Sequence, residues 1–197
     1  SYHMRDVFES MAEMCKEMGK EDEAKAYEEI CGVLRKIWKL NGDGIRFTNA
    51  EDYAKAIECF DEALNMCRER GFWATFVFIG CNEVLTMIKM QDIDTALAFL
   101  DEIMELWESK IGEKNELLLA DIYWGYGGVY FDVGEYADSR KYFEKALEIM
   151  DRWLPEWDGH LISLIENLGA ACCLMGDRET GEEYFRRIGE EDLSMLF

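Results

Sequence analysis

A repeat of about forty residues is the feature that most restricts the fold of this chain. Four segments share one order of small and large apolar residues. The small residue that opens the second half of each segment stands at Ala56, Ala96, Ser139 and Gly181, at intervals of 40, 43 and 42 residues. A helix-forming sequence with such a period predicts one helical hairpin per copy, because a single hairpin buries its apolar face only by stacking on its neighbours.

The clearest copy runs from Ala120 to Leu147. Its small residues Gly127 and Ser139 are expected to let two helices cross closely, and Gly134 is expected to end the first helix in a left-handed conformation. Large residues at helical spacing fill the space beside the crossing: Tyr123, Tyr130 and Phe143. The other copies cover residues 44–63, 87–103 and 168–188.

The N-terminal segment fits the repeat less well. Residues 11–27 predict a further hairpin, with helices near 5–18 and 21–39. Asn41-Gly-Asp-Gly44 should then interrupt the next helix, because each glycine costs about 1 kcal/mol in a helix interior and favours a turn. Either that next helix is short, or residues 21–40 are themselves the first helix of a hairpin with a long loop. A capping role would explain the atypical sequence.

The copy at residues 120–147 resembles the tetratricopeptide repeat. Tyr126-Gly127 stands where that family has Leu-Gly, and Tyr123 stands where it has its first large aromatic residue. The period exceeds the usual 34 residues of the family; in this respect the chain is similar to kinesin light chains and related adaptors. The resemblance implies an all-α fold, a right-handed superhelical solenoid of antiparallel helical hairpins.

One domain is expected over residues 4–197, because no linker-like stretch divides the chain. Ser1–His3 is interpreted as the remnant of an expression tag. Pro155–Gly159 should separate the last two hairpins, and the apolar residues 193–197 should begin a further helix, fold back or pack against another copy. The expected hairpins lie near 5–40 (the variant one), 41–70, 72–110, 117–153 and 159–191.

The net charge of −21 restricts the partners. A field of this sign repels phosphate backbones and anionic lipid, so nucleic acid and membrane surfaces are not expected to bind. Basic or amphipathic protein segments are attracted. With no run of 18 apolar residues and no signal-peptide pattern, a cytoplasmic location is expected.

Catalytic and metal-binding patterns are missing from the sequence. The seven cysteines are odd in number and form no CxxC pair, which favours buried free thiols in a reducing compartment over disulfides or zinc. No strand precedes the glycine pairs as a phosphate loop requires, and His160 is the only histidine outside the tag remnant. We therefore expect no enzyme activity, no cofactor and no metal.

The family resemblance implies that the first helix of each hairpin lines a concave groove. Asn82 and Asn167 occupy corresponding points of two repeats, where an amide can bond the backbone of an extended peptide. Alternatively, both amides satisfy neighbouring helices and Trp124 belongs to the core between repeats. The predicted groove residues are Phe78, Asn82, Lys89, Trp124, Phe131, Asp132, Glu166 and Asn167, with Cys81 and Cys173 as further candidates.

The predicted function is that of a scaffold or adaptor that binds a basic or amphipathic peptide or helix in an acidic groove. Lys89 stands almost alone, so the basic clamp that holds a C-terminal carboxylate in chaperone-binding members is not matched. Two alternatives are a peptide-sensing regulatory protein and a self-associating, dimeric module.

Overall fold

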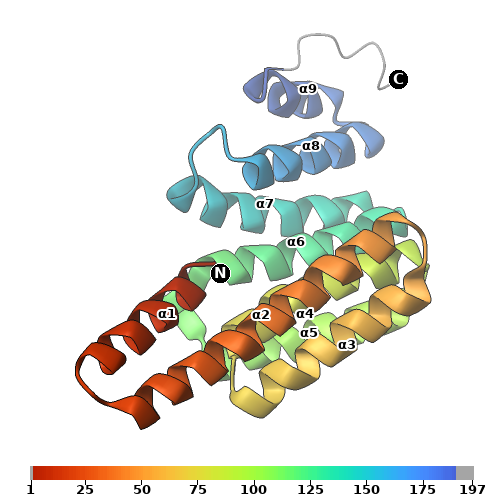
Figure 1. Cartoon of the computed structure of the whole chain (residues 1–197). Coiled ribbons are helices and arrows are strands. Elements are labelled where there is room, and N and C mark those ends of the chain that lie inside the picture. The colour runs from red at the N-terminus through yellow and green to blue at the C-terminus, as the bar shows by residue number, and fades with distance from the viewer. Residues whose placement is uncertain (1, 190–197) are drawn as a thin grey trace. The chain divides into compact units, whose positions relative to one another are not determined.

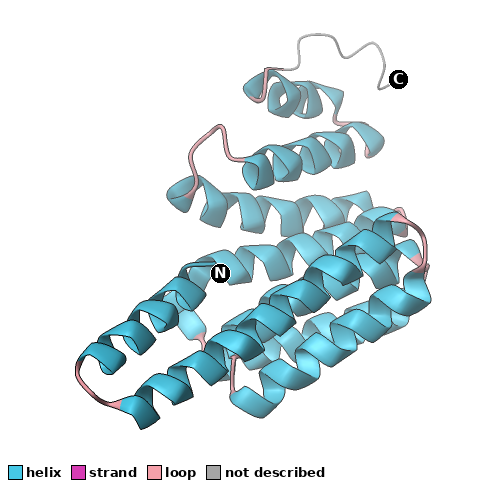
Figure 2. Cartoon of the chain, in the orientation of Figure 1, coloured by secondary structure: helices cyan, strands magenta, loops and turns pink. Residues whose placement is uncertain are grey.

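The computed structural model describes residues 2–189, without the side chains of residues 2–5 and 113, and this part of the chain contains helices and no strand (Figures 1 and 2). The predicted all-α class is confirmed. The apolar residues 193–197 lie outside the described residues. The helices are α1 (Tyr2–Glu17), α2 (Glu21–Asn49), α3 (Tyr53–Arg70), α4 (Trp73–Lys89), α5 (Ile93–Lys110), the short 3-10 helix η1 (Gly112–Asn115), α6 (Glu116–Asp132), α7 (Tyr136–Trp153), α8 (Gly159–Leu174) and α9 (Arg178–Arg187).

The described residues form two compact units, divided between residues 86 and 87 within α4. The first unit holds α1 to α3 and most of α4, and the second holds the last residues of α4 and all helices that follow.

The turns inside the hairpins share one backbone geometry. In each, the residue before the second helix donates its N–H to a carbonyl five residues earlier, as Glu135 does to Tyr130 at 2.9 Å and Asp177 to Cys172 at 2.9 Å. This bond satisfies a carbonyl that the helix end leaves without a partner. It requires a left-handed residue at the turn, and the five hairpins within residues 2–189 supply Gly19, Glu51, Gln91, Gly134 and Gly176.

A glycine facing a phenylalanine marks the helix crossing in three hairpins. The phenylalanine follows sixteen residues after the glycine each time, and the pairs are Gly44–Phe60, Gly127–Phe143 and Gly169–Phe185. A Cβ atom built on these glycines would lie 2.7, 2.3 and 3.0 Å from the ring. Real Cβ atoms essentially never come within 3.0 Å of another atom, so the first two crossings require glycine unless the ring shifts, and the third leaves a Cβ atom only a tight fit.

Ser139 has the role expected of a small residue at the crossing. It is fully buried, and its hydroxyl donates a hydrogen bond of 2.8 Å to the carbonyl of Gly127. Ala56 and Ala96 are also fully buried, and Gly181 packs against the backbone of Gly169. The expected close packing is thereby confirmed residue by residue.

The turn expected at Asn41–Gly44 is wrong, because α2 continues without a break from Glu21 to Asn49. Tertiary contacts outweigh the low helix propensity of glycine here. Gly44 lies under the ring of Phe60, and the buried Asn41 accepts a hydrogen bond from Asn82. Residues 21–40 are thus part of the first helix of a hairpin, but the loop that follows is the short turn 50–52 and not a long one.

The long α2 packs on α1 and on α3 with different parts of its length, as Figure 1 shows. Its first part faces α1: Tyr27 stacks on Phe8, and Arg35 pairs with Glu9 at 3.4 Å. Its second part faces α3: Lys36 pairs with Glu62 at 2.6 Å, and Gly44 meets Phe60. α2 therefore belongs to two hairpins at once.

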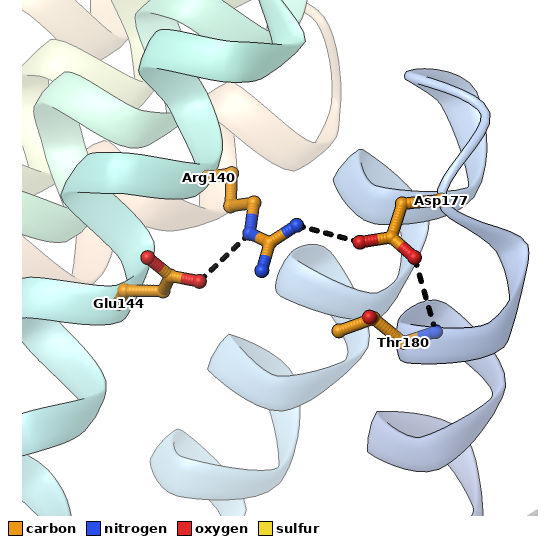
Figure 3. A network of polar contacts seen from close by, with 4 residues as sticks. All are labelled: Arg140, Glu144, Asp177 and Thr180. Carbon is orange, nitrogen blue, oxygen red and sulfur yellow. Dashed lines mark hydrogen bonds and ion pairs between the residues drawn. The ribbon is translucent and has the colours of Figure 1, made fainter.

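In the second unit, a polar network joins α7 to the turn before α9 (Figure 3). The Arg140 guanidinium donates to Glu144 at 2.7 Å and to Asp177 at 2.8 Å. The other Asp177 oxygen accepts from the backbone N–H of Thr180 at 3.3 Å, which caps α9. The hydrogen bond from Thr180 and the one from Arg140 hold the pKa of Asp177 below its usual value. The network links the α6–α7 hairpin to the α8–α9 hairpin.

Candidate peptide-binding faces

In the first unit, side chains of α2 and α4 meet along one stripe of each helix. We call Trp38, Ile45, Phe78, Asn82 and Leu85 the α2–α4 face. The rings of Trp38 and Phe78 pack with centroids 5.5 Å apart. Ile45 and Leu85 remain exposed, by 39% and 48%. The face therefore offers apolar side chains to solvent beside a half-buried amide.

The amide of Asn82 already has one partner. Its Nδ2 donates a hydrogen bond of 3.0 Å to Oδ1 of Asn41 on α2. The sequence left open that this amide bonds a neighbouring helix. One of its two N–H groups does so. The second N–H and the side-chain oxygen are left for other partners.

In the second unit, the corresponding stripe lies on α6 and α8. We call Asp121, Trp124, Phe131, His160 and Asn167 the α6–α8 face. The half-buried Trp124 meets the His160 ring edge-on, with centroids 6.3 Å apart and planes at 81°. Asn167 is exposed, so its amide faces solvent and not a neighbouring helix. Phe131 is half-buried against Tyr136 at the start of α7.

The remaining sequence-predicted residues differ in exposure and in contacts. Asp132 is exposed and accepts a hydrogen bond of 2.7 Å from the side chain of Gln91. Lys89 is exposed in the last turn of α4, and Glu166 is half-buried on α8. Cys173 packs its sulfur against Gly181, inside the α8–α9 hairpin, while Cys81 is half-buried on α4.

Asp121 is a member of the α6–α8 face that the sequence reading missed. It interrupts the apolar run of residues 117–124, and this single acidic position was the available signal. Burial raises the pKa of its carboxyl to about 6, although the nearby His160 acts in the opposite direction. A half-buried carboxylate on the same face as Trp124 is an unusual feature that a binding role has to account for.

The thiols are not placed as nucleophiles. Cys31, Cys67 and Cys172 are buried, and burial raises the pKa of Cys67 to about 12 and that of Cys172 to about 11. Such thiols stay protonated at neutral pH and react slowly. Among the described residues, no group of three or more His, Cys, Asp or Glu could hold a metal ion. None of the helices in the described part of the chain is long and apolar enough to cross a membrane.

Known proteins share the fold at low sequence identity. A Rap protein, solved in complex with Competence and Sporulation Factor, has a TM-score of 0.70 and 12% identity, with 92% of this chain and 52% of that chain covered. BtubC (BKLC) from P. vanneervenii has a TM-score of 0.60 and 19% identity, with 97% and 80% covered. A putative kinesin light chain with nearly identical TPR-like repeats, from Podosopora anserina, has a TM-score of 0.53 and 11% identity, with 93% and 92% covered.

The chain spans about half the length of the Rap structure. No curated protein matches it in sequence. Residues 84–152 match the family described as tetratricopeptide repeat, and this range includes the copy at 120–147 that carries the resemblance. Residues 84–152 thus carry a match to the tetratricopeptide repeat, and the chain shares the fold of the solved structures named above.

Proposed function

We propose that this chain is a protein-interaction scaffold. It binds a basic or amphipathic peptide on the exposed side of the first helix of a hairpin. The proposal rests most directly on the α6–α8 face. There, the rings of Trp124 and His160 meet, and the amide of Asn167 is exposed on α8. An amide bonds the backbone of an extended peptide, and aromatic rings supply contact area at low cost in conformational entropy.

The rigidity of the hairpins supports this role. Gly127–Phe143 and Gly169–Phe185 hold α6 on α7 and α8 on α9, so the face exists before a ligand arrives. A preformed face loses little conformational entropy on binding. The net charge of −21 favours a partner that carries lysine or arginine, and it speeds the encounter of such a partner with the chain.

The predicted residues receive distinct roles in this proposal. Asn167 and the unused groups of Asn82 bond the peptide backbone. Trp124 and Phe131 contact apolar side chains on the α6–α8 face, and Phe78 does so on the α2–α4 face. Lys89, Asp132 and Glu166 are assigned the selection of the charge of the ligand.

The experiment is a pull-down from the native cell, followed by a peptide array of the bound partner. Trp124→Ala and Asn167→Ala should each weaken binding by about 1–2 kcal/mol, the range of ordinary interface contacts. The matched controls are Trp157→Ala in the exposed loop before α8 and Asn65→Ala on the exposed side of α3. Equal losses in the test and control variants would exclude the α6–α8 face as the binding surface.

A peptide-sensing regulatory role is the second candidate. The observation that favours it is the likeness in fold to a Rap protein solved with Competence and Sporulation Factor. A sensor changes conformation when the peptide binds, whereas a passive scaffold does not. Small-angle scattering with and without the mapped peptide separates the two, because only the sensor changes its radius of gyration.

The dimeric alternative stays a prediction, and light scattering tests it.

A further inference from the structure

The Asp121 carboxylate is the one feature of the α6–α8 face that general peptide binding does not use. Among the described residues, none forms a hydrogen bond or ion pair with it, and His160 is the neighbour that lowers its pKa against the effect of burial. Ionised groups that lose part of their hydration are normally paired or bonded, because an unpaired one costs several kcal/mol. An unpaired carboxylate here is therefore a position that a ligand can complete.

The surroundings of Asp121 select the kind of ligand. Trp124 follows one turn later on α6, so its indole lies on the same helical face as the carboxylate. The ring of His160, from α8, meets Trp124 edge-on. A carboxylate beside an indole offers a cation both an ion pair and an aromatic surface.

An anionic or neutral ligand group would gain little at this position. An anion would be repelled by Asp121 and by the surplus of 42 acidic over 21 basic residues. A neutral apolar group would bury the carboxylate further and leave it without a partner. A cation offsets the lost hydration most fully, because it adds an ion pair to the hydrogen bond that a neutral donor could also give, and burial already raises the pKa of the Asp121 carboxyl to about 6.

We propose that Asp121, Trp124 and His160 form a subsite for a single lysine or arginine side chain of the bound peptide. The cation pairs with the Asp121 carboxylate, its aliphatic stem lies against Trp124, and His160 closes the α8 side. The inference rests on the proposed function, because it assigns one side chain of a peptide that binds the α6–α8 face. It adds a specificity determinant to a face that otherwise binds only the backbone and the apolar side chains of the peptide.

The test uses two labelled peptides and three forms of the full chain. One peptide contains a single lysine among leucine and glutamine residues, and the other has norleucine in place of that lysine, which keeps the stem and removes the charge. The protein forms are the unmodified chain, Asp121→Asn and Glu148→Gln. Glu148 is exposed on α7, so Glu148→Gln removes the same charge away from the subsite. Fluorescence anisotropy gives Kd for each pair.

The unmodified chain and Glu148→Gln should bind the lysine peptide about tenfold more tightly than the norleucine peptide, which is about 1.4 kcal/mol for a charge-assisted contact. Asp121→Asn should bind both peptides equally. Equal affinity of the unmodified chain for the two peptides overturns the subsite and leaves the scaffold role in place. Equal losses of lysine preference in both variants also overturn it, because the preference then comes from the general field. Failure of the unmodified chain to bind either peptide overturns both proposals.

Discussion

The α2–α3 hairpin and the α6–α7 hairpin are built on the same crossing, but their first helices use glycine differently. In α6, Gly125, Gly127 and Gly128 all face another side chain, from Leu100, Phe143 and Ile88 respectively. In α2, only Gly44 faces one, and Gly32 and Gly42 border open space. A glycine within a helix therefore has no single structural role in this fold. Its role depends on the residue that another helix places opposite.

The largest effect is expected where the crossing is tightest. Gly127→Ala places a Cβ atom 2.3 Å from the Phe143 ring, against 2.7 Å from Phe60 for Gly44→Ala. Overpacking of this kind costs about 3 kcal/mol for Gly127→Ala and about 2 kcal/mol for Gly44→Ala. Urea unfolding followed by circular dichroism measures both. A larger loss for Gly44→Ala would show that α2 adjusts less easily than α6.

The second prediction concerns the carboxyl that α6 carries on its face. The folded pKa of Asp121, about 6, lies above the unfolded value of 3.8, so the folded state binds more protons between these values. The contribution of Asp121 to stability is therefore full below pH 4 and is lost as the pH rises to 6. Asp121→Asn should remove this slope and raise the free energy of unfolding at neutral pH by about 2 kcal/mol.

The control for this pH slope is Asp132→Asn, an exposed position on the same helix. It should leave the slope between pH 4 and 6 unchanged. If both variants keep the slope, the carboxyl responsible is not Asp121. If Asp121 is retained for binding, Asp121→Asn should gain stability and lose the preference for lysine.

The third prediction exchanges the turn residues of the two hairpins. Glu51 and Gly134 both adopt a left-handed conformation, with φ of 60° and 82°. Glu51→Gly should stabilise the chain by about 1 kcal/mol, and Gly134→Ala should destabilise it by a similar amount, because a side chain is strained there. Thermal unfolding measures both. Equal signs would mean that the two turns are not equivalent.

The smallest effect is expected at the open glycine of α2. Gly42→Ala meets no atom within 4 Å and should stabilise the helix by about 0.5 kcal/mol. It is also the matched control for Gly44→Ala, two residues away. Destabilisation by Gly42→Ala, measured by the same urea unfolding, would indicate that the helix bends at this point.

The hairpins were readable from the sequence because their signals are local. Gly127, Ser139 and Gly134 lie within one copy of the repeat, and helical spacing relates them directly. The break expected at Asn41–Gly44 failed for the opposite reason. A crossing glycine and a turn glycine look alike in sequence, and what distinguishes Gly44 is Phe60 on the next helix.

The candidate site was readable only in part. The position of Asn167 on α8 predicts its exposure, since helical spacing decides which side of a helix faces solvent. The partner of Asn82, by contrast, lies on α2, in the hairpin before it. The depth of Asp121 likewise depends on how α8 packs beside α6, and no local pattern in the sequence encodes that packing.

The double use of α2 has a consequence for rearranging the chain by duplication or recombination. The α6–α7 hairpin begins and ends at turns, so a copy of it carries its own crossing, Gly127 on Phe143. A cut inside α2 would not yield a complete hairpin. Tyr27 packs on α1 and Gly44 packs on α3, and both lie on one continuous helix. The segment from α1 to α3 should therefore be grafted as one block, whereas a graft of the α6–α7 hairpin keeps its own crossing and loses only its contacts to neighbouring hairpins, such as Gly125 with Leu100 and Arg140 with Asp177.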